Sequence, residues 1–97
     1  MSITHYNDVD VQQFINKEVS VNSMFFSGRG NFRSFPREIT DDNQQVTFVE
    51  SGMRYLLQKG HKMVQLFDMS DGHSNYRLQY DTKEYTWTLL KISALPR

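Results

Sequence analysis

The sequence predicts an α+β, β-rich fold: an antiparallel meander of about five to six strands, as a sheet or a small, partly open barrel, with one or two short helices. In the C-terminal third, three strand-like runs are separated by turn residues. Aromatic and β-branched residues alternate with polar ones in these runs, as in half-buried strands. Only two short segments have apolar residues at helical spacing. We expect strands near residues 19–26, 35–40, 45–50, 63–69, 76–80 and 85–92.

The C-terminal meander has the clearest strand pattern. Between Tyr76 and Tyr80 the side chains alternate strictly, so that Leu78 and the two tyrosines share one face. Turn-forming residues around Gly72, and a polar segment over residues 81–84, predict chain reversals before and after this strand. In the last strand the apolar pattern changes parity near residues 89–90. Either a β-bulge or a strand buried on both faces explains that change.

The core is expected on the more apolar face of each strand. These positions are Trp87, Leu78, Tyr76, Leu66, Val64, Phe48 and Val46. Residues 63–69 are apolar on both faces, which predicts that this strand is covered on both sides, by an N-terminal helix or by another subunit.

A short helix is expected in the N-terminal segment, residues 1–18. Asp10 is suited to cap it, and Val11, Phe14, Ile15 and Val19 stand at helical offsets. From residue 19 onward the pattern favours strand.

A second short helix is expected between Ser51 and Gly60. Met53, Leu56 and Leu57 have helical spacing there, with the serine placed to cap the start and the glycine to end it. An irregular crossing or a continued strand are open alternatives for this segment.

Length and composition limit the classes of protein. The 97 residues suit one domain, 1–97, with an N-terminal segment 1–18 and a meander body 19–97. The lack of cysteine excludes disulfides and thiolate metal sites and fits a reducing compartment, so a cytoplasmic location is expected. The N-terminus lacks a signal-peptide pattern and no long apolar run exists, so no membrane partner is expected. Eleven basic and eleven acidic residues cancel, which removes any global electrostatic attraction to DNA.

No motif with catalytic or cofactor chemistry stands out. His5, His61 and His73 are scattered and lack the spacing of a metal site. The glycines at 28 and 30 lack the remaining residues of a dinucleotide or phosphate loop. No serine lies in a nucleophile motif, and cysteine is absent. We therefore expect no cofactor, no metal and no enzymatic activity.

One constellation has the composition of a binding surface. Cationic and aromatic side chains interleave over residues 29–37, and a second basic stretch spans 54–62. Aromatic rings stack on unpaired bases and guanidinium groups pair with phosphates. The members are Arg29, Phe32, Arg33, Phe35, Arg37, Arg54, Lys59 and Lys62. A structural role is the alternative: the two phenylalanines could anchor the loop in the core, and the arginines could pair with neighbouring acidic residues.

Two functions follow as hypotheses. The first is a small, non-enzymatic protein-interaction or regulatory module with a protein partner, a second copy in a homodimer included, because a short meander leaves strand edges that accept another strand. The alternative is a single-stranded nucleic-acid-binding domain that uses the 29–37 segment and the 54–62 stretch. Net neutrality favours the first, since nucleic-acid-binding domains are usually basic.

Overall fold

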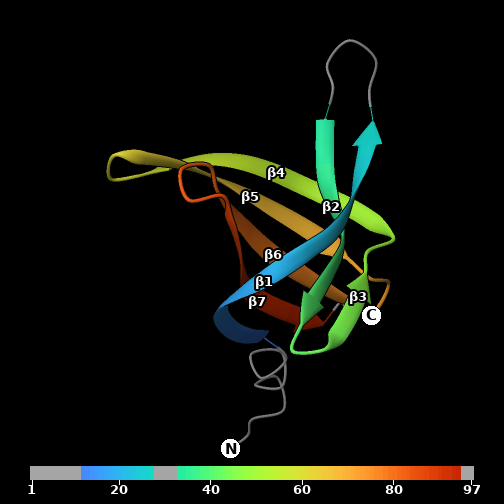
Figure 1. Cartoon of the computed structure of the whole chain (residues 1–97). Helices are drawn as coiled ribbons and strands as arrows, with labels where there is room; N and C mark the ends of the chain where they lie inside the picture. The colour runs from blue at the N-terminus through green and yellow to red at the C-terminus, as the bar shows by residue number, and fades with distance from the viewer. Residues whose placement is uncertain (1–11, 28–32, 95–97) are drawn as a thin grey trace, which may run out of the picture.

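Seven antiparallel strands form one sheet in this protein (Figure 1). The computed structural model describes residues 12–27 and 33–94. The strands are β1 (Gln12–Ser27), β2 (Arg33–Asp41), β3 (Gln44–Thr47), β4 (Glu50–Lys59), β5 (Lys62–Ser70), β6 (Ser74–Asp81) and β7 (Thr86–Ala94), in the spatial order β3-β2-β1-β7-β6-β5-β4. The described part holds no helix, so the expected α+β class is wrong and the fold is all-β, with more strands than expected.

The long strand β1 bends the sheet into two packed parts. Its first half, residues 12–19, pairs with β7, and its second half, residues 20–27, pairs with β2. Figure 1 shows β1 running obliquely across the molecule between these two neighbours. The ring of Phe35 on β2 meets the ring of Phe67 on β5 edge to face, with centroids 6.0 Å apart. The two parts of the sheet therefore enclose a common core.

The buried side chains of that core come from five strands and one connection. Its buried members are Val19, Phe35, Ile39, Phe48, Phe67, Met69, Leu78 and Leu89. Among the positions expected from the sequence, Phe48, Val64 and Leu78 are buried, whereas Val46, Leu66, Tyr76 and Trp87 are partly buried. The expected core face was thus correct on β6 and β7. On β5 the core cluster holds Phe67 and Met69, which lie on the opposite face from the expected Leu66, so the face expected there was wrong.

A bulge explains why the sequence around residue 16 resembles a helix. The pairing of β1 with β7 shifts register between Phe14 and Lys17, and Asn16 has a positive φ of 55°. The bulge interrupts the alternation that would have marked a strand. Ile15 and Val19 both pack in the core, and their spacing of four fits a strand as well as a helix. The helix expected up to residue 18 is therefore wrong over residues 12–18, and its expected start lies outside the described residues.

The second expected helix is β4, so the alternative of a continued strand is correct. β4 is an edge strand in which every residue except Tyr55 is exposed, and so no face selects apolar side chains in alternation. Its ladder to β5 shifts register between Ser51 and Arg54, which places a bulge at residues 52–53. A Cβ atom on Gly52 would lie 3.1 Å from the Asp68 carbonyl oxygen, so glycine permits this close approach.

The C-terminal meander follows the sequence closely. Leu78 pairs with Leu89 and Arg77 pairs with Lys91, so Leu90 is the extra residue of a bulge, one of the two explanations expected for the parity change. The turn before β6 contains Gly72 with φ 97°, a left-handed conformation that glycine adopts without strain.

The connection between β3 and β4 brings the two edges of the sheet together at one end. It consists of Phe48 and Val49. The Phe48 N–H donates to the carbonyl oxygen of Arg37 on β2 at 2.7 Å, and the Val49 N–H donates to that of Ser70 on β5 at 2.8 Å. These bonds tie β2, near one edge, to β5, near the other, and so curl the sheet around its core.

Candidate functional site

Of the eight expected surface residues, those whose side chains the structure describes lie in several different environments. Arg29 and Phe32 lie outside the described residues, and so does the side chain of Arg33. Phe35 is buried in the core against Phe67. Arg37 is exposed, with its Cζ atom 5.7 Å from the centroid of the Phe25 ring.

The two lysines of the basic stretch already have partners. Lys59 Nζ donates to Gln79 Oε1 at 2.7 Å, and Lys62 Nζ lies 2.8 Å from Asp81 Oδ2. The Asp81 carboxylate is buried at the start of the turn between β6 and β7. Its other oxygen accepts the backbone N–H groups of Lys83 and Glu84 at 2.9 and 3.1 Å. Lys62 thus supports this turn.

Because Asp81 is ionised in the folded protein, we expect the protein to lose stability in acid. The Lys62 ammonium, followed by the backbone N–H groups of Glu84 and Lys83, lowers the pKa of Asp81 to about 2. A lowered folded-state pKa stabilises the fold above the ordinary pKa of 3.8, and this contribution is lost as the pH falls through about 2. We expect the melting temperature to fall between about pH 5 and about pH 2, and Asp81→Asn to reduce that fall. Calorimetry across this pH range measures both.

The control for this prediction is Glu18→Gln. Glu18 is exposed and its carboxylate accepts no hydrogen bond from the described residues, so its replacement should leave the acid profile unchanged. Asparagine at position 81 keeps an oxygen for the turn. Identical acid profiles of Asp81→Asn and the wild type would contradict the prediction.

Arg54 belongs to a hollow of about 330 Å³ at the inner face of the sheet, the inner hollow. Met24 and Ser34 contribute from β1 and β2, and Arg54 and Gln65 from β4 and β5. The remaining wall is aromatic: Phe67, Tyr80 and Trp87 come from three adjacent strands. The Trp87 ring lies 4.7 Å from that of Tyr80 and 5.3 Å from that of Phe67, between centroids.

The guanidinium of Arg54 lies over this aromatic wall. Its Cζ atom is 5.5 Å from the centroid of the Phe67 ring, and Nη2 donates to Gln65 Oε1 at 3.1 Å. Arg54 makes no ion pair with any carboxylate among the described residues. A guanidinium has five N–H donors. The inner hollow therefore combines ring surface with an unneutralised cation.

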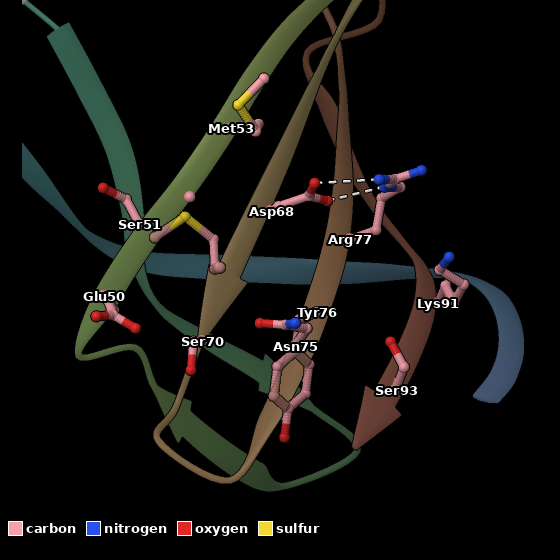
Figure 2. Close-up of a pocket in the computed structure, with 12 residues that line it drawn as sticks. Glu50, Ser51, Met53, Asp68, Ser70, Asn75, Tyr76, Arg77, Lys91 and Ser93 are labelled. Carbon is pink, nitrogen blue, oxygen red and sulfur yellow. Dashed lines mark hydrogen bonds and ion pairs between the residues drawn. The ribbon is translucent and has the colours of Figure 1, made fainter. Parts of the chain in front are cut away.

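A second hollow, of about 450 Å³, lies over the outer side of β4–β7, the outer hollow (Figure 2). Arg77 on β6 donates from Nε and Nη2 to the two Asp68 carboxylate oxygens at 2.8 and 3.0 Å, the pair marked in Figure 2. The Tyr55 hydroxyl donates to the same carboxylate at 3.4 Å. The hydrogen bond to Asp68 raises the pKa of Arg77. Both charges of this pair are satisfied within the chain.

Tyr76, also on the outer hollow, is held by a turn. Its hydroxyl donates to Asp71 Oδ2 at 2.9 Å. Burial, and then this hydrogen bond, raise the pKa of Tyr76 to about 12, so the phenol is protonated at neutral pH. Burial alone would raise the pKa of Asp71, but bonds from the His73 and Ser74 N–H groups and from Tyr76 lower it. These hydrogen bonds fix the β5–β6 turn.

The exposed edge of β4 is the third candidate. Among the described strands, β4 pairs only with β5, and its other side has no neighbour. Met53, Leu56 and Leu57 are exposed along it, and Met63 follows at the start of β5. The opposite edge strand, β3, has only four residues. β4 is thus the longer open edge of the sheet.

Sequence reasoning found Arg54 but missed its setting. Tyr80 and Trp87 were placed on core-facing positions of their strands, and their pairing at the inner hollow depends on the register between β6 and β7. Ser34 reaches the same hollow only because the sheet bends at β1. The apolar residues of β4 could be seen in the sequence, but their helical spacing concealed that they belong to an exposed edge strand.

The described residues offer no set of three or more His, Asp or Glu side chains that could hold a metal ion. No helix in residues 12–27 and 33–94 is long and apolar enough to cross a membrane. The chain matches no protein-family model, and neither a curated protein nor a solved structure is significantly similar to it.

Proposed function

We propose that this chain is a non-enzymatic protein-interaction or regulatory module that pairs with a second copy of itself along β4. The observation that carries the proposal is the ten-residue edge strand with exposed apolar side chains. Such an edge presents unpaired backbone groups to another strand, and natural proteins usually cover or shorten it. Within residues 12–27 and 33–94 no strand covers the β4 edge, and β4 is ten residues long.

The charges along β4 favour a second copy as the partner. Glu50 begins the strand and Lys59 ends it. In an antiparallel pair about a two-fold axis, Glu50 comes near Lys59 of the partner subunit. In this register Arg54 and Tyr55 lie at the axis, and Met53 lies beside them, opposite Leu56 of the partner subunit. A parallel pair would place like charges together. The bulge at 52–53 lies near the start of β4, and residues 54–59 pair with β5 without a further register shift, so this regular part of the edge is the one offered to a second strand.

Sedimentation velocity at increasing concentration tests the dimer. We expect Leu56→Lys to weaken self-association by about tenfold or more, because it adds a charge at the centre of the edge. Glu50→Lys alone and Lys59→Glu alone should each weaken the dimer, and the double exchange should restore it, since like charges then face opposite charges again.

A matched control is Glu84→Gln, an exposed acidic position in the β6–β7 turn and outside β4. It should leave the dimer unchanged. A wild-type chain that stays monomeric at high concentration would overturn the homodimer. Failure of the double exchange to restore association would overturn the antiparallel pairing.

Non-enzymatic action and a cytoplasmic location are part of the same proposal. The Asp68–Arg77 pair and the protonated Tyr76 phenol are engaged in structural contacts, which supports a binding role rather than catalysis. The cysteine-free sequence agrees with a reducing compartment.

Single-stranded nucleic acid is the second candidate. One observation favours it: Ser34 from the first stretch and Arg54 from the second line the same aromatic hollow. The burial of Phe35, the Lys62–Asp81 pair and the zero net charge weigh against it. Binding of oligothymidylate that weakens steeply with salt, with a flatter salt dependence after Arg54→Gln, would favour this candidate, because each phosphate contact releases a counterion.

A further inference from the structure

We infer that the inner hollow is a binding site for a small, flat aromatic ligand that carries a carboxylate or phosphate group. This inference goes beyond the proposed dimer and does not depend on it. Three aromatic rings, one unneutralised guanidinium and the polar groups of Ser34 and Gln65 meet at one hollow. Pockets for small molecules are typically apolar and aromatic with a few convergent polar groups.

The aromatic wall indicates a flat ring. Tyr80 and Trp87 are partly buried and line the hollow, so part of each ring surface is open to a ligand. Aromatic groups prefer offset-stacked or edge-to-face contacts with such rings. A volume of about 330 Å³ is at the lower end of ligand pockets, which fits one or two fused rings.

The charge of the hollow indicates an anion. No acidic side chain lines it in the part of the chain that the structure describes, and Arg54 is its one charged group there. The guanidinium retains N–H donors beyond the one given to Gln65 and pairs well with carboxylate or phosphate oxygens. At the outer hollow, in contrast, the guanidinium of Arg77 is already bound by Asp68. The inner hollow is therefore the better anion site.

The chain has one tryptophan, so the indole N–H of Trp87 gives a single resonance that reports on the inner hollow. In an NMR titration, dilute protein labelled with nitrogen-15 receives naphthoate, naphthamide or acetate. Separate titrations use adenosine monophosphate and adenosine. Naphthoate should shift this resonance to saturation. The neutral amide should bind about tenfold more weakly, because it loses the charge-assisted bonds to Arg54. Acetate, which has no ring, should not shift it.

Two variants assign the charge effect. Arg54→Gln removes the cation at an exposed position and should reduce naphthoate affinity to that of naphthamide, while naphthamide binding stays as in the wild type. Arg37→Gln is the matched control, an exposed arginine that does not line the hollow, and it should change neither affinity.

The anionic ring could belong to a free small molecule or to a nucleotide within a nucleic-acid strand. Adenosine monophosphate, adenosine and oligothymidylate distinguish these two sources. Saturable binding of naphthoate or adenosine monophosphate, with adenosine weaker, supports a free small molecule. The inference is overturned if neither anion saturates the Trp87 shift, if the amide binds as tightly as naphthoate, or if Arg54→Gln and Arg37→Gln behave alike. Binding of oligothymidylate at Trp87 without binding of either small anion overturns it in favour of a nucleotide within a strand.

Discussion

Replacing Phe48 by alanine is expected to lower the free energy of unfolding by about 3–5 kcal/mol. The Phe48 side chain is 1% exposed and its ring lies 5.2 Å from that of Tyr76, centroid to centroid. It occupies the connection that draws the edges of the sheet together, so its removal leaves a cavity at the point of closure. Urea denaturation followed by circular dichroism measures the loss.

Val49→Ala is the matched control, since the neighbouring Val49 is 67% exposed and should change stability by less than about 0.5 kcal/mol. If Phe48→Ala does not fold, Phe48→Leu leaves a smaller cavity and should show an intermediate loss. Equal stability of Phe48→Ala and Val49→Ala would contradict the closure of the core by Phe48.

The second large effect is expected at the centre of the meander. Leu78→Ala should cost about 2–5 kcal/mol, because Leu78 is fully buried between its cross-strand neighbours Phe67 and Leu89, and their packing leaves little room for collapse. The same substitution at the exposed Leu56 serves as control and should stay within about 0.5 kcal/mol in dilute protein. The two midpoints in urea give the comparison directly. Similar losses at both positions would place the core elsewhere.

The local pattern was sufficient where a strand has one buried face and two neighbours. In β6 the alternation of Tyr76, Leu78 and Tyr80 reflects contact of one face with the core, and all three pack there. The turn at Gly72 follows from local backbone conformation. The parity change near residues 89–90 was also visible locally, but it allowed two explanations, and the register of β6 with β7 shows that the bulge at Leu90 is the correct one.

The same reasoning failed where the ladder is irregular or open on one side. Around Asn16 a bulge removed the alternation, and in β4 exposure of both faces left no selection for it. In both segments apolar residues three and four apart resembled a helix. Helical periodicity in a short segment is therefore weak evidence when a bulge or an edge strand gives the same spacing.

In the candidate sites, too, the sequence indicated some residue types, whereas their neighbours depend on the tertiary structure. The cation Arg54 and the interleaved aromatic residues could be identified as candidate binding chemistry from the sequence, but Phe35 lies in the core, as the structural alternative expected. Side chains separated by many residues meet at the inner hollow only through strand order and register, which involve long-range pairing. No local pattern encodes which ring will be adjacent to which cation.

The sequence by itself determined the β-rich character, the C-terminal meander, the core faces of β6 and β7 and the absence of disulfide chemistry, because these depend on composition and on alternation between neighbouring residues. The tertiary structure alone decided the all-β class of the described part, the bend at β1 that encloses the core, the open edge of β4 and the meeting of Trp87 with Arg54 at one hollow. The physical reason is that each of these depends on which strands pair and in what register. That choice is made by the packing of the whole chain.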